Sequence, residues 1–116
     1  SASPNNTQVA FLFGFFEMRS GKLKEAETRF QRCLRLEPNS SKALAGLAEI
    51  RLHQGLESNA EVGNMILKAV ERSPNDPFVL HASAFFSWKS GKPSQAGEIL
   101  FRIDSQIIKI FDDPWL

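Results

Sequence analysis

Two stretches of this sequence are near copies of each other: Arg19–Phe30, "RSGKLKEAETRF", and Lys89–Leu100, "KSGKPSQAGEIL". Their glycines, Gly21 and Gly91, mark equivalent points of the two copies, and Gly55 lies close to midway between them. The three glycines are spaced by about 34 residues, and such self-similarity at a fixed period indicates a chain built from repeated units.

Prolines keep the same period, since Pro38 and Pro74 are separated by nearly the same interval as successive glycines. Between these marks apolar residues recur at steps of three and four, as in "LKEAETRFQRCLRL", which is typical of amphipathic helices. Glycine is expected to end the first helix of each unit and proline the second. We predict an all-α fold with helices at residues 7–19, 23–36, 41–53, 58–72, 77–89 and 93–103, and a further short helix around 104–112.

A helix-turn-helix unit of this length resembles the tetratricopeptide repeat (TPR). In the first unit the resemblance is carried by Gly14, Gly21, Ala26, Phe30 and Pro38. It implies a right-handed α-α superhelix of about three stacked helix pairs plus a C-terminal capping segment. The predicted organisation is a disordered lead-in or cloning remnant (1–6), three TPR units over 7–103 (7–40, 41–76 and 77–103), and a C-terminal cap or the start of a further repeat (104–116).

A narrower resemblance covers Ala43–Gly91. It is carried by the "ALAGLA" helix, an enlarged turn around Asn59, and the passage "SPNDPFVL" followed by Phe85 and Phe86. These features are similar to the large TPR scaffold subunit of the RNA polymerase II-associated factor (Paf) complex. The resemblance implies a non-enzymatic, nuclear scaffold of a transcription elongation complex, with a cytoplasmic location as the alternative.

In the TPR family the first helix of each unit lines a concave surface, and here that surface is mostly apolar. Exposed apolar patches of this kind usually mark partner surfaces, so we expect a groove for a protein partner, as a helix or an extended peptide. Other subunits of an elongation complex are the candidate partners, and the alternative is that these residues only meet adjoining repeats. The predicted groove residues are Phe11, Phe15, Met18, Glu49, Leu52, Phe78, His81, Phe85 and Trp88.

Repeat proteins that grip the acidic carboxyl end of chaperones use lysine and asparagine along these faces. The matching positions here are different residues, so we expect no chaperone carboxylate clamp. They are Phe11, Phe15, Ala45, Glu49, His81 and Phe85.

Composition argues against other function classes. With 14 basic and 13 acidic residues the net charge is +1, which gives no bulk attraction to nucleic acid. The longest apolar stretch, Val9–Phe16, is far shorter than the roughly 20 residues that cross a bilayer, so we expect no membrane partner. A TPR peptide-binding adaptor outside transcription and a helical-repeat nucleic-acid binder remain the alternatives.

The chain offers no recognisable chemistry of a catalytic site. His53 and His81 have no carboxylate at ligand spacing beside them in the sequence, so we expect no metal. The single cysteine, Cys33, occupies a small-residue position in a helix and is expected to be core. We therefore predict a protein that is not an enzyme and needs no cofactor.

Overall fold

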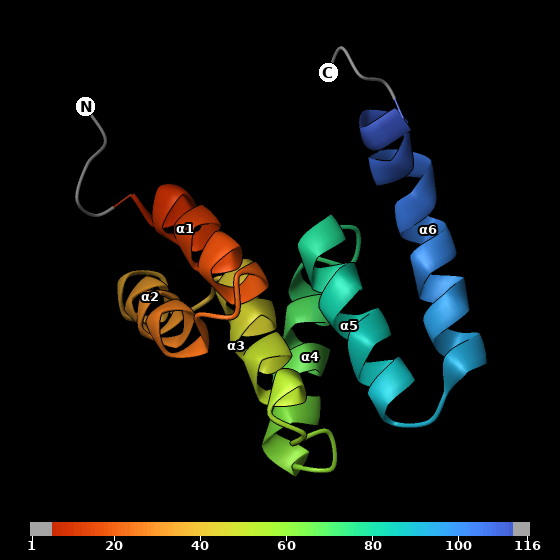
Figure 1. The fold of residues 1–116 in the computed structure, drawn as a ribbon, viewed down its shortest axis with the longest axis horizontal. Helices are drawn as coiled ribbons and strands as arrows, with labels where there is room; N and C mark the ends of the chain where they lie inside the picture. The colour runs from red at the N-terminus through yellow and green to blue at the C-terminus, as the bar shows by residue number, and fades with distance from the viewer. Residues whose placement is uncertain (1–5, 113–116) are drawn as a thin grey trace.

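The computed structural model describes residues 6–112, with side chains described for residues 6–103. Within that range the chain forms helices and no strand (Figure 1). The all-α fold of three helix pairs is therefore confirmed. The helices are α1 (Thr7–Arg19), α2 (Leu23–Leu36), α3 (Ser41–His53), α4 (Ala60–Arg72), α5 (Pro77–Lys89) and α6 (Pro93–Asp112).

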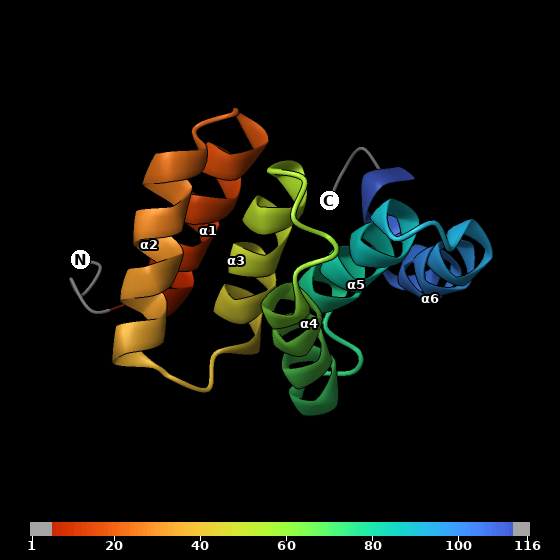
Figure 2. The same ribbon diagram turned by 90° about the horizontal axis from the view of Figure 1, so that it is seen from below.

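The helices stack as pairs. Each first helix packs on its own second helix, and α3 also packs against α1, α2 and α5. In Figure 1 α1, α3 and α5 follow one another across the molecule, and α6 lies at its right-hand edge. Figure 2 shows α1 and α2 side by side at the end opposite to α6. Over the described residues no helix has both the length and the hydropathy that a bilayer crossing requires.

The repeated glycines end the first helix of each pair. Gly21, Gly55 and Gly91 have φ angles of 84°, 80° and 79°, in the left-handed region that glycine adopts without a Cβ penalty. After the first of them, the Lys22 N–H donates to the Glu17 carbonyl at 2.8 Å, which closes a Schellman turn. The period in the sequence is thus the period of these turns.

Two predicted boundaries differ from the structure. α4 begins at Ala60, two residues late, because the Asn59 side chain accepts the Glu61 N–H at 2.8 Å and caps the helix there. α6 runs without a break to Asp112, so the separate short helix predicted at 104–112 is wrong. Whether residues 104–116 act as a cap stays a prediction, because their side chains lie outside the described part.

Phe30 joins the first two units. It is fully buried between Gly14 of α1 and Gly46 of α3. A Cβ on Gly14 would lie 2.6 Å from one ring carbon, and a Cβ on Gly46 would lie 2.7 Å from another. Three helices approach closely here because two of them carry no side chain against the ring. Ala26 and Cys33 are buried beside it, as predicted.

Candidate functional site

Aromatic rings from α1 and α5 meet across α3. The Phe78 centroid lies 5.1 Å from that of Phe11 and 5.0 Å from that of Phe15, both in edge-to-face geometry. On α3, the buried Ala45 stands at the position that Phe11 holds on α1 in the preceding unit. This small side chain leaves room for rings of the first and third units to touch.

Two cations lie on these rings. The Arg19 guanidinium carbon is 5.6 Å from the Phe15 centroid, and the Lys42 Nζ is 5.9 Å from the Phe78 centroid. Lys42 also pairs with Asp76, whose carboxylate caps α5. We call the surface formed by Phe15, Arg19, Lys42, Phe78 and His81 the inner face. It combines half-buried rings with positive charge.

A buried carboxylate lies beneath His81. The Nδ1 atom of His81, on α5, is 2.6 Å from the Oε1 atom of Glu49, on α3. The Glu49 side chain is 5% exposed and that of His81 is 42% exposed, so the imidazole covers the carboxylate from the solvent side. The chain therefore exposes the histidine, and not the acid, to the solvent.

This contact predicts a pH dependence of stability. The hydrogen bond to Glu49 raises the pKa of His81 above its ordinary value of 6.5, against the lowering effects of burial and the Arg19 charge. A raised pKa in the folded chain means that the pair stabilises the fold fully below about pH 6.5, and that this stabilisation is lost as pH rises through the folded pKa. We expect the urea midpoint to fall as pH is raised from about 6 to about 8.5.

The control is the other histidine. His81→Gln is expected to flatten this part of the pH profile. His53→Gln, which removes an imidazole packed 4.9 Å from the Phe85 ring centroid, is expected to keep it. A His81→Gln profile with the wild-type slope would mean that the Glu49 contact does not carry the effect.

The predicted groove residues differ in how far they are exposed to solvent. Phe11, Met18, Glu49 and Leu52 are buried and offer a partner almost no contact area. Phe15, Phe78, His81 and Phe85 are half-buried, and only Trp88 of this set is exposed, at 64%. Trp88 lines a hollow of about 180 Å³ between α5 and α6, together with Ala96, Leu100 and His81 of the inner face.

Two residues of the inner face, Arg19 and Lys42, are not among the predicted groove residues, although Lys42 was expected on the concave side of its helix. Arg19 follows Phe15 by four residues, the spacing that places two side chains together on a helix, so the sequence contained a signal for this contact. Lys42 and Phe78 belong to different helices, and no local pattern joins them. The same holds for Glu49 and His81, which are 32 residues apart.

The described residues hold no group of three His, Cys, Asp or Glu side chains that could bind a metal ion. Glu49 and His81 form a pair from two helices, and an imidazole with a single carboxylate lacks the three or four ligands of a zinc site. The groups that the inner face offers are aromatic rings and cations.

Comparisons with known proteins give a fold and no family. No protein-family model matches the chain, and no curated protein matches its sequence. A solved structure of the type III secretion translocator chaperone SycD of Yersinia enterocolitica, in an alternative dimer, is similar, with a TM-score of 0.64 and 20% identity over 91% of this chain and 79% of that chain. The fold is a TPR-like helical repeat.

Two further SycD structures agree. One has a TM-score of 0.64 at 19% identity, covering 89% of this chain and 75% of that chain. The other, SycD in complex with a peptide of the translocator YopD, has a TM-score of 0.62 at 19% identity, covering 89% and 77%.

These neighbours correct two expectations. The partner prediction, which excluded a chaperone carboxylate clamp and favoured subunits of an elongation complex, is contradicted, because the similar structures are chaperones and one holds a peptide of its translocator. The predicted nuclear location is contradicted as well, because all three are structures of a bacterial secretion chaperone.

Proposed function

We propose that this chain is a non-enzymatic helical-repeat protein that binds an extended peptide of a partner protein on its inner face, as a chaperone or adaptor does. The observation that carries the proposal is that Arg19 and Lys42 lie over half-buried phenylalanine rings. Beside them, the His81 imidazole covers the buried Glu49 carboxylate. Such a surface suits a peptide that alternates apolar and acidic side chains. The peptide held by a structure of the same fold supports this mode.

The alternatives lack such support. The scaffold of a transcription elongation complex, implied by the narrower resemblance, has no observation of the inner face in its favour. A nucleic-acid binder needs a basic stripe, whereas the net charge of the chain is +1.

The test is to select peptides from a random displayed library on the wild-type chain and to measure their affinity by calorimetry. Arg19→Glu is expected to weaken the selected peptides about tenfold or more, because it replaces a cation on the inner face with a repelling charge. The matched control is Lys24→Glu on α2, which reverses another exposed positive charge, away from the inner face. Selection of no peptide, or equal affinity for both variants, would sink the proposal.

A further inference from the structure

In each of the first two units, the first helix of the next unit packs on equivalent residues. In the first unit α3 packs beside Met18, Ala26 and Phe30, which are all buried. In the second unit the corresponding buried cluster, with α5 packed on it, contains Leu52, Val62 and Ile66. The repeat therefore reuses one interface, formed by the end of a first helix and the start of its second helix.

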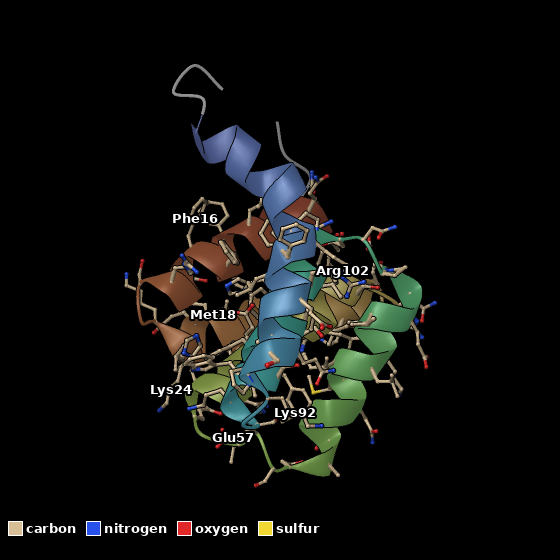
Figure 3. The ribbon with its side chains drawn as sticks, turned by 90° about the vertical axis from the view of Figure 1, so that its right-hand side faces the viewer. Phe16, Met18, Lys24, Glu57, Lys92 and Arg102 are labelled. Carbon is tan, nitrogen blue, oxygen red and sulfur yellow. The ribbon has the colours of Figure 1, made fainter. Side chains whose placement is uncertain are left out.

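The third unit carries the same positions, and two of the three are exposed. Trp88, Ala96 and Leu100 occupy the positions that Met18, Ala26 and Phe30 hold in the first unit. Trp88 is 64% exposed and Leu100 is 48% exposed, whereas their counterparts are buried. Together with His81, Ala84 and Phe85 they line the hollow of about 180 Å³. We call this surface the α5/α6 end face; Figure 3 looks onto this end of the molecule, with α6 in front.

The opposite end of the molecule carries the other half of the interface. The residues of α3 that pack on the first unit are Ala43, Gly46, Leu47 and Ile50. The residues at the same positions of the preceding unit lie on α1, and we call them the α1 face: Val9, Leu12, Phe13 and Phe16.

The α1 face is apolar and exposed. Leu12 is 39% exposed and Phe16 is 64% exposed, with Phe16 at the upper left of Figure 3. Arg29 lies over the Phe13 ring, but Phe13 is still 54% exposed, so Leu12, Phe13 and Phe16 together provide the open apolar area. One molecule thus carries both halves of a repeat interface: the α1 face at one end and the α5/α6 end face at the other.

Each residue of the α1 face is larger than its counterpart on α3, and at the tightest contact the difference is compensated. Leu12 stands where α3 has Gly46, which must be small because it touches the Phe30 ring. On the α5/α6 end face the position of Phe30 is occupied by the shorter Leu100. A leucine can therefore enter where the first interface accepts only glycine.

We infer that a second copy of this chain docks its α1 face on the α5/α6 end face, so that the copies continue the repeat head to tail. The two faces are different surfaces, so the contact is heterologous and leaves a free face at each end. Chains of copies are expected to grow with concentration and not to stop at a dimer. Of the inner face this contact shares only His81, so it does not require a peptide to be bound there.

The test uses one variant for each face. Phe16→Glu places a charge on the α1 face, and Trp88→Glu places one on the α5/α6 end face; both replaced side chains are 64% exposed, so neither substitution disturbs the core. Sedimentation of the wild-type chain is expected to show an average mass that passes twice the monomer mass as concentration rises. Each variant alone is expected to stay monomeric.

The mixture of the two variants is decisive. Each variant keeps one working face, so an equimolar mixture is expected to form a complex of two chains and to grow no further. Leu67→Glu on α4, a similarly exposed apolar residue outside both faces, is expected to assemble as the wild type does. A wild-type chain that stays monomeric into the millimolar range, or variants whose mixture stays monomeric, would overturn the inference.

Discussion

Phe30→Ala is expected to lower the free energy of unfolding by about 3–5 kcal/mol. The ring is 0% exposed and serves two interfaces at once, the pairing of α1 with α2 and the stacking of α3 on the first unit. Alanine would leave a cavity between Gly14 and Gly46, and neither glycine has a side chain to fill it. Urea denaturation followed by circular dichroism measures the loss.

The matched control is Phe101→Ala. Phe101 is 76% exposed on α6, and truncation of an exposed side chain is expected to change the free energy of unfolding by no more than about 0.5 kcal/mol. A loss below about 1 kcal/mol for Phe30→Ala would mean that the first two units do not depend on this ring. A biphasic transition would indicate that the first unit then unfolds by itself.

The environment of Phe30 shows which contacts could be predicted from the sequence and which could not. Gly14, Ala26 and Phe30 carry the TPR resemblance in the sequence, and in the structure these three residues lie together where the helices meet. The second glycine against the ring, Gly46, comes from the next unit. Local periodicity carries no information on which residue a neighbouring unit brings, so this contact was not predicted.

The burial of the candidate-site residues could not be predicted either, because it depends on side chains that other units bring. The TPR resemblance assigned Phe11, Glu49 and Phe78 alike to a groove surface, whereas Phe11 and Glu49 are buried and Phe78 is half-buried. Whether such a residue lies at the surface depends on the size of side chains from other units, such as His81 above Glu49. The charge of the site is also set across units, since Lys42 and Phe78 meet from different helices.

Leu52→Ala is expected to lower the free energy of unfolding by about 2–5 kcal/mol, whereas Trp88→Ala should change it by no more than about 0.5 kcal/mol. The two residues occupy equivalent positions in successive units, and both were predicted to line the groove. Leu52 is 0% exposed, because α5 packs over it, while Trp88 is 64% exposed. Denaturation of both variants at low protein concentration measures the difference.

Equal losses for the two variants would show that Trp88 is covered in solution even when the chain is dilute, which contradicts the exposed end face. The loss for Trp88→Ala could instead grow with protein concentration, so that it approaches the loss for Leu52→Ala. That result would indicate that Trp88 contacts a partner, because a partner that binds only the folded chain stabilises it by mass action. Docking of an α1 face would then bury Trp88 as α5 buries Leu52. The same repeat position would thus be part of the core in the second unit, where α5 of the same chain packs on it. In the third unit it would be part of an intermolecular contact, where α1 of another copy packs on it.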